Sequence, residues 1–203
     1  RSSAASDVYK RQVEAEPGAK LVYGLKDRFD EKKFRAALDS GTVTDLLNYV
    51  PVKAGDVFFI PKGLVHAIGA GILIAEIQEN SNVTYRVYDY GRLKDGVPRE
   101  LHVDQAMKTI RDFTEEEIEA QRFSRGRKEP GLLADCRYFR TEIAGIDGSA
   151  DFSEASGFVS VICLEGQGDI DGEKFVKGDS YLIPAGYGGF TVNGVCRLLI
   201  TTE

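Results

Sequence analysis

Two segments of the sequence share one pattern, and this internal repeat limits the fold more than any other feature. Residues 53–63 (KAGDVFFIPKG) match residues 176–186 (VKGDSYLIPAG), with a constant offset of 123 between positions 53 and 176. In both copies Gly-Asp favours a tight turn into a strand, and Pro-x-Gly reverses the chain at the far end of that strand. A turn–strand–turn unit that occurs twice predicts two related double-stranded β-barrels in one chain.

Most of the remaining sequence also predicts strands. Short runs rich in apolar and β-branched residues, separated by turn residues, predict strands at 20–23, 50–52, 57–60, 65–68, 72–78, 84–89, 137–143, 158–165, 168–170, 180–183, 190–192 and 197–201. Helical spacing predicts short helices at 31–38, 44–49 and 101–110, the second of them capped by Thr42 or Thr44. The predicted fold class is therefore mainly β, with a few short helices.

The sequence predicts three parts along the chain. Residues 1–12 (RSSAASDVYKRQ) are small, polar and without periodicity, which predicts a non-native or disordered leader joined to a protein that has lost its natural beginning. Residues 13–127 form the expected first barrel domain, which is incomplete and carries a helical insertion. Residues 128–203 form the expected second barrel domain, which has no metal ligand at the corresponding position of the repeat.

Composition argues against several classes of function. The 203 residues carry a net charge of -6, and no basic cluster is longer than residues 125–128 (RGRK), so nucleic acid is not an expected partner. Apolar runs such as residues 70–75 and 158–164 are far too short to cross a bilayer, so no membrane partner is expected. The three cysteines lie far apart without ligand spacing, which favours buried thiols in a reducing cytoplasm over disulfides or a cysteine metal site.

The densest group of chemically useful residues follows the first copy of the repeat. His66 stands three residues after the last glycine of that copy, where the second copy has Gly189, so the turn itself does not require an imidazole. The next strands carry further polar side chains, namely Glu76, Gln78, Glu79, Asn80 and Arg86. Because a buried polar group costs on the order of several kcal/mol unless it is paired, this density predicts the wall of a polar pocket.

Each of these residues has a structural and a functional interpretation. His66 is either a satisfied core histidine or a metal ligand. Arg86 is either paired with Asp89 or a nearby glutamate, or it is a fixed positive charge that faces an anionic intermediate. Glu76 is a candidate general acid and base.

The sequence supplies few ligands for a metal ion. Zinc takes three or four protein ligands, whereas the second histidine, His102, opens a predicted helix where capping or surface exposure is expected. Glu76 and Glu79 could add carboxylate oxygens to His66. Either residues outside this chain complete the site, or the site binds no metal.

A resemblance to a known family sharpens these alternatives. A turn–strand–turn unit with a histidine three residues beyond its glycine resembles the cupin fold. Beyond this, residues 60–69 (IPKGLVHAIG), 75–92 (AEIQENSNVTYRVYDYGR) and 98–102 (PRELH) closely resemble the short type I mannose-6-phosphate isomerases of bacteria. Residues 15–25 and 178–192 fit the same family in order, so the resemblance covers about residues 13 to 203.

The resemblance implies an enzyme that interconverts mannose 6-phosphate and fructose 6-phosphate through a cis-enediol, with one bound zinc. It implies that His66 is the last metal ligand, Arg86 the active-site arginine and Glu76 a glutamate that moves protons, while the other ligands would precede Val13. The expected partner is a small hexose phosphate. No Gly-rich phosphate loop is present, so lysine or arginine side chains are expected to meet the phosphate; Lys62 and Lys94 are candidates, although a lysine in a turn is usually just solvated.

Two further classes of function remain open from the residues themselves. The first is a sugar-phosphate-binding or regulatory cupin without catalysis, which the shortage of metal ligands would suit. The second is an iron-dependent cupin oxidoreductase, which needs two histidines and a carboxylate and is therefore disfavoured by the two histidines of this chain.

Overall fold

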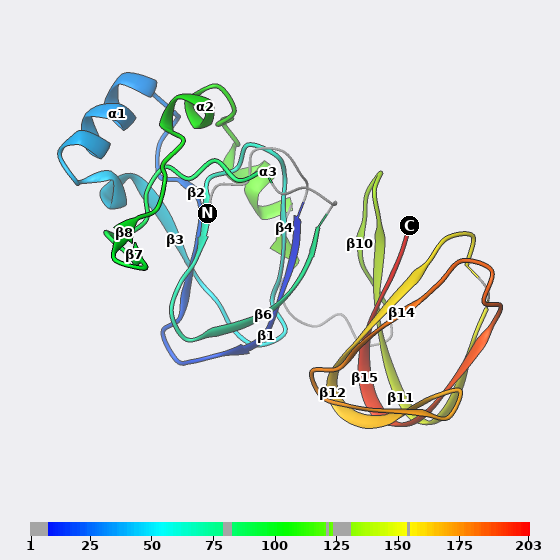
Figure 1. Ribbon diagram of the computed structural model, residues 1–203. Coiled ribbons are helices and arrows are strands. Elements are labelled where there is room, and N and C mark those ends of the chain that lie inside the picture. The colour runs from blue at the N-terminus through cyan, green and yellow to red at the C-terminus, as the bar shows by residue number, and fades with distance from the viewer. Residues whose placement is uncertain (1–7, 79–82, 121, 124–130, 154) are drawn as a thin grey trace. The chain divides into compact units, whose positions relative to one another are not determined.

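A computed structural model shows a mainly β protein in two compact units, residues 1–124 and residues 125–203 (Figure 1). The structure describes residues 8–78, 83–120, 122–123, 131–153 and 155–203. The division expected from the sequence, between residues 127 and 128, lies in a segment outside these described residues. No helix within the described residues is long and apolar enough to cross a membrane.

The first unit contains three antiparallel sheets. Its strands are β1 (Val8–Ala15), β2 (Lys20–Leu25), β3 (Leu47–Pro51), β4 (Val57–Ile60), β5 (His66–Ile68), β6 (Ile72–Gln78), β7 (Leu93–Lys94), β8 (Val97–Pro98) and β9 (Arg122–Phe123). One sheet has the order β6-β1-β4-β9, the next has the order β3-β2-β5, and β7 pairs with β8 in a hairpin. The strands of the first two sheets bury one apolar core, which includes Leu21, Tyr23, Phe58 and Ile60.

The helices of the first unit are α1 (Glu31–Asp39), the 3-10 helix η1 (Val43–Leu46), α2 (Val103–Met107) and α3 (Glu115–Ala120). Helices α1 and α2 lie together at one end of the first unit, whereas α3 lies beside β4 (Figure 1). Helix α1 begins at Asp30, whose carboxylate accepts a hydrogen bond from the backbone N–H of Lys33 at 3.0 Å, as an N-cap residue should. Its buried residue Phe34 packs in one cluster with Met107 of α2, so packing rather than length stabilises these short helices.

Strand β1 corrects the expectation for the start of the chain. Residues 8–12 were expected to belong to a non-native or disordered leader, yet they lie in a strand that pairs with both β4 and β6. Lys10 stands opposite Phe58 on one side and Glu76 on the other. The polar composition of this segment gave no strand pattern in the sequence. The partner strands, rather than its own residues, supply the apolar contacts that order it. Residues 1–7 lie outside the described residues.

The second unit is one curved antiparallel sheet (Figure 1). Its strands are β10 (Gly131–Asp135), β11 (Arg140–Phe152), β12 (Val159–Ile170), β13 (Glu173–Val176), β14 (Ser180–Ile183) and β15 (Phe190–Thr202). They lie in the order β10-β11-β15-β12-β13, and β14 pairs with β12. The predicted strands at 190–192 and 197–201 are one strand, and the apolar core of the unit includes Val161, Val192 and Leu198.

The internal repeat is confirmed at the level of single hydrogen bonds. The carboxylate of Asp56 accepts a bond from the N–H of Lys53 at 2.9 Å, and the carboxylate of Asp179 accepts one from the N–H of Val176 at 2.8 Å. The last glycine of each copy has a positive φ, 90° in the first and 78° in the second, which L-residues with a side chain rarely adopt. The two closed barrels expected from this repeat are not confirmed, since the strand orders within the described residues are open.

Three predicted elements differ from the structure. The helix expected at 44–49 is the shorter 3-10 helix η1 followed by β3, because residues from Leu47 onward pair with strand β2, where Leu47 stands opposite Leu25 and Val50 opposite Leu21. Thr42 is the N-cap residue of η1 but forms no side-chain capping bond. The helix expected at 101–110 is reduced to α2, and α3 lies in a segment expected to be only a charged connection.

The strand expected at 84–89 is also wrong, which matters for the site. Only Tyr85 takes part in a β-bridge there. The backbone bonds of this segment go elsewhere: the carbonyl of Arg86 accepts from the N–H of His102 at 2.7 Å, and the carbonyl of Asp89 accepts from the N–H of Arg92 at 3.0 Å. Without a regular strand, side chains in residues 84–89 do not alternate between two faces of a sheet.

Candidate active site

A polar cavity of about 510 Å³ lies in the first unit, and its volume is in the range of small-molecule sites. Strand β1 contributes Lys10, strand β5 contributes His66 and strand β6 contributes Glu76. Two segments outside these strands complete the wall. Its lining residues are Lys10, His66, Ala67, Ile68, Glu76, Gln78, Thr84, Tyr88, Asp89, Tyr90, Arg92 and Arg99.

His66 lies on strand β5, opposite Tyr23 of β2, and its side chain is buried. Its Nδ1 is 3.0 Å from the carbonyl oxygen of Leu64. Because a carbonyl oxygen only accepts, Nδ1 must carry the proton, which leaves the lone pair of Nε2 available for a ligand or substrate. Burial, with a smaller contribution from the nearby ammonium of Lys10, lowers the pKa of His66 to about 3. The imidazole is therefore neutral at physiological pH.

Glu76 reaches the same cavity from strand β6. Its Oε2 lies 2.6 Å from Nζ of Lys10, which is its direct cross-strand neighbour on β1. The side chain of Lys10 is 3% exposed and that of Glu76 is 33% exposed, so the ion pair extends from the buried wall toward the opening. A carboxylate held in this way has a fixed orientation within the cavity that His66 also lines.

Arg86 is not among the residues that line the cavity. Its Nη1 donates to the carbonyl oxygen of Glu100 at 3.1 Å, and its backbone N–H is 3.4 Å from Nδ1 of His102. Its Nε is buried and has no hydrogen-bond partner within the described residues. The structure thus brings His66 and Glu76 together in one cavity but does not bring Arg86 into its lining.

The second histidine, His102, lies at the start of a helix. His102 is the N-cap residue of α2, although its side chain forms no capping bond. Its ring lies 6.2 Å from that of Tyr85, and its Nε2 is 3.8 Å from the carboxylate of Glu100. His102 was expected to cap a helix or to lie at the surface; it stands at the N-cap position but does not cap with its side chain. Glu79 and Asn80, which were also considered for the pocket, lie outside the described residues.

Sequence reasoning missed several lining residues. Lys10 was assigned to a leader, and Tyr88, Tyr90, Arg92 and Arg99 were not singled out as candidates. For the last four a signal was available, because they lie within residues 75–92 and 98–102, the segments that carried the resemblance to the isomerases.

The metal expected from the resemblance does not fit the described residues alone. No group of three or more His, Cys, Asp and Glu side chains within them lies close enough together to hold a metal ion. His66 offers one nitrogen donor of the right form, but Glu76 is already paired with Lys10. One imidazole is fewer than the three protein ligands that a zinc site usually needs.

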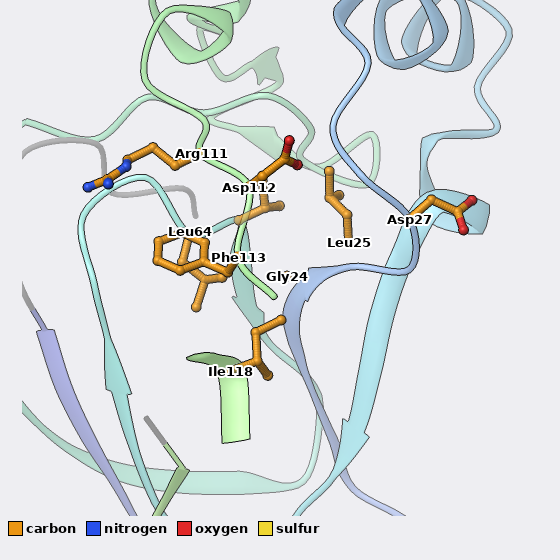
Figure 2. A pocket seen from close by; sticks show the side chains of 9 residues that line it. Gly24, Leu25, Asp27, Leu64, Arg111, Asp112, Phe113 and Ile118 are labelled. Atoms are coloured by element: carbon orange, nitrogen blue, oxygen red, sulfur yellow. The ribbon is translucent and has the colours of Figure 1, made fainter. Parts of the chain in front are cut away.

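A second cavity in the same unit is too small for a substrate. Its volume is about 20 Å³, which is close to the space that a single water needs. Figure 2 shows Leu25, Leu64 and Ile118 around its centre, whereas the charged ends of Asp27 and Arg111 point away from them. This cavity therefore does not compete with the larger one as a binding site.

Comparison with known proteins gives the family. The profile of the mannose-6-phosphate isomerase cupin domain matches residues 131–202. The chain is 33% identical over 202 residues to mannose-6-phosphate isomerase ManA of Bacillus subtilis, covering 93% of this chain and 62% of that protein. The chain belongs to the mannose-6-phosphate isomerase family. It spans less than two thirds of the length of this relative.

A further family member and a solved structure agree with this assignment. Mannose-6-phosphate isomerase of Streptococcus mutans is 34% identical over 177 residues, covering 85% of this chain and 56% of that protein. The crystal structure of the mannose 6-phosphate isomerase from Bacillus subtilis superimposes with a TM-score of 0.79 at 28% identity, covering 99% of this chain and 66% of that one. The match of the isomerase cupin profile coincides with strands β10 to β15, whereas the polar cavity lies in the other unit of this family member.

Proposed function

We propose that this chain binds a hexose 6-phosphate in the 510 Å³ cavity and catalyses its aldose–ketose isomerisation, between mannose 6-phosphate and fructose 6-phosphate. The observation that carries the proposal is that His66 and Glu76 line one polar cavity of a size suited to a monosaccharide phosphate. The names of the relatives in Bacillus subtilis and Streptococcus mutans support the choice of reaction and substrate.

The proposed chemistry is the transfer of one proton between neighbouring carbons. Glu76, as a carboxylate, removes the proton at C2 of the aldose while O1 takes up a proton, which gives a cis-enediol; the proton then returns at C1 as the O2 hydroxyl loses its proton, so the oxygen protons balance. The ion pair with Lys10 engages Oε2 and fixes the orientation of the base. The neutral imidazole of His66 has Nε2 free to accept a hydrogen bond from a sugar hydroxyl, which would orient the reacting end.

Arg86 is proposed as the fixed positive charge that stabilises the enediolate. What supports this role is its buried Nε–H, which has no hydrogen-bond partner within the described residues. Because no acceptor within the described residues offsets the charge at this nitrogen, the guanidinium can act on a nearby anion through its field. The position of the guanidinium outside the cavity lining means that this support is electrostatic rather than by direct contact.

The proposal includes zinc only as a metal ion that His66 would help to bind. We propose this residue as one ligand of a zinc ion whose other ligands come from outside the part of the chain that the structure describes; with the ion bound, Nε2 would hold the metal in place of the sugar hydroxyl. When bound, such an ion would act as a Lewis acid toward the oxygens of the sugar. The proton transfer proposed above uses side chains of this chain alone.

The alternative function is binding of a sugar phosphate without catalysis. It is favoured by one observation, namely that the described residues contain no group of three or more potential metal ligands. Both functions place the sugar phosphate in the same cavity, and they differ only in turnover.

An isotope experiment separates the two functions. The purified chain is incubated with mannose 6-phosphate in D₂O with added zinc, and the C2 and C1 protons are followed by NMR. Isomerisation through a cis-enediol should form fructose 6-phosphate and introduce deuterium at the reacting carbons. The variant Glu76→Gln should be slower by about 10²-fold or more, the usual contribution of a general base. Glu173→Gln, an exposed change on β13 in the other unit, should leave the rate unchanged.

Two results would contradict the catalytic proposal. Absence of both product and deuterium with the parent chain would leave the binding function. Undiminished turnover by Glu76→Gln would remove Glu76 from the mechanism.

A further inference from the structure

The charges around the large cavity do not balance. Its described lining holds the cationic side chains of Lys10, Arg92 and Arg99 and the carboxylates of Glu76 and Asp89. Lys10 is paired with Glu76, and Arg99 is paired with Asp89. Arg92 forms no ion pair within the described residues, so one positive charge of the lining is left for an anion from outside.

Arg92 is held in place by stacking rather than by a carboxylate. Its guanidinium lies 5.3 Å from the centre of the Tyr90 ring, and the Tyr90 ring packs edge-on against Tyr88 at 4.9 Å. The turn beneath is fixed by the bond from the N–H of Arg92 to the carbonyl of Asp89 and by the positive φ of Tyr90, 55°. Stacking uses the face of the guanidinium and leaves its edge N–H donors free for an oxyanion.

Burial separates Arg92 from His66. His66 is 4% exposed, whereas Arg92 lies on an exposed stretch of chain. In a hexose 6-phosphate the phosphate on C6 is at the opposite end of the molecule from C1 and C2. A substrate whose reacting carbons reach His66 and Glu76 would therefore leave its phosphate toward the exposed part of the lining, where a dianion keeps part of its hydration.

We propose that Arg92, supported by Tyr90, binds the phosphate group of the sugar phosphate and selects phosphorylated over free hexoses. This inference rests on the proposed function for the position of the sugar but not on catalysis. Neither Lys62 nor Lys94, the lysines considered from the sequence, is among the residues that line the cavity. Arg99 lines it, but Asp89 occupies two of its donors.

Binding measurements test the assignment without requiring turnover. Isothermal titration calorimetry compares mannose 6-phosphate, mannose and inorganic phosphate on the parent chain, Arg92→Gln and Arg92→Lys. A matched control is Arg111→Gln, because Arg111 also stacks on an aromatic ring, 5.9 Å from the centre of Phe113, but is not among the residues that line this cavity. It borders the smaller cavity instead (Figure 2). Circular dichroism and the melting temperature of each variant show whether it is folded.

The expected result is specific to the phosphate. Arg92→Gln should bind mannose 6-phosphate at least tenfold more weakly, about 1.4 kcal/mol, while Arg92→Lys should keep part of the affinity and Arg111→Gln all of it. The affinity for mannose should be the same in all four proteins. Equal binding of mannose 6-phosphate by folded Arg92→Gln would overturn the assignment, as would a parent chain that binds neither mannose 6-phosphate nor phosphate.

The outcomes for this site and for the proposed function are distinguishable. A parent chain that binds mannose 6-phosphate through Arg92 but does not isomerise it would keep the phosphate site and remove the catalytic function. A chain that isomerises it, with an unchanged KM in Arg92→Gln, would keep the function and remove the site. If Arg92→Gln does not fold, the binding of inorganic phosphate to the parent chain and to Arg92→Lys is compared by ³¹P NMR. Equal phosphate affinity in the two proteins would contradict a bidentate guanidinium site.

Discussion

Arg99 binds Asp89 through two hydrogen bonds, one from Nε and one from a terminal guanidinium nitrogen, each to a different carboxylate oxygen. The two residues bracket the β7–β8 hairpin, so this pair ties both ends of the hairpin to the cavity wall. The hydrogen bond from Arg99 also holds the pKa of Asp89 below its usual range. A planar two-bond pair of this kind fixes orientation as well as distance.

The first prediction concerns this pair. Asp89→Asn should loosen the hairpin, because the amide cannot accept both bonds from Arg99. Hydrogen exchange measured by mass spectrometry should show the amides of residues 93–98 exchanging about tenfold faster or more. The control is Asp27→Asn, which removes an exposed ion pair with Lys33 at 3.4 Å and should leave these amides unchanged. Unchanged protection of the hairpin in Asp89→Asn would show that its own turn suffices.

The second prediction concerns strand β1. Removing residues 1–12 takes away the part of β1 that pairs with both β4 and β6, including Lys10. We expect the amides of β4 and β6 to lose protection, because two neighbouring strands lose their hydrogen-bond partner at once. The amides of β12 and β15 in the other unit serve as the internal control. A shortened chain in which β4 and β6 stay protected would restore the idea of a dispensable leader.

The sequence predicted those parts of the fold that local chemistry determines. The Gly-Asp and Pro-x-Gly turns force the chain to reverse at fixed places, so the strands between them, β4 and β14, were predicted with their observed bounds. Helix α1 was predicted to within one residue because an apolar face and Gly41 mark it. Elements ordered by distant partners were missed, as β1 shows, since Val8 and Tyr9 favour a strand but Lys10, Arg11 and Gln12 add no alternating apolar pattern.

The candidate site likewise contains residues that the sequence predicted and a residue whose position it did not predict. His66 was found because the second copy of the repeat, with Gly189, shows that the turn needs no imidazole. Glu76 was found because β6 is a regular strand that follows the repeat. The position of Arg86 could not be predicted, because the backbone of its segment bonds to His102 instead of to a strand. Irregular backbone removes the alternation on which assignment of faces depends.

The third prediction compares the equivalent aspartates in the two copies of the repeat. Asp56 and Asp179 accept equivalent bonds in their turns, but Asp56 is 0% exposed whereas Asp179 is exposed. Asp56→Ala should lower the free energy of unfolding of the first unit by about 1 to 3 kcal/mol, because a buried N–H loses its partner. Asp179→Ala should cost the second unit less, since water replaces the lost bond. Urea unfolding followed by hydrogen exchange of each unit measures both, and equal costs would contradict the role of burial.

The last prediction concerns the charge of His66 in the metal-free protein. With a pKa lowered to about 3 by burial, the folded ring stays neutral at a pH where the unfolded ring, with a pKa near 6.5, takes up a proton. Stability should therefore be lost as the pH falls below about 6.5 toward 3, at up to about 1.4 kcal/mol per pH unit.

The ring proton signals of His66 in NMR should accordingly stay constant between pH 8 and pH 5. His66→Asn identifies these signals and keeps an N–H donor near the carbonyl of Leu64, so it serves as the control for stability. Between pH 6.5 and pH 5 the free energy of unfolding of this variant should depend less on pH than that of the parent. A His66 signal that titrates near pH 6.5 would mean that the imidazole is solvated, and the neutral Nε2 proposed to face the substrate would lose its support.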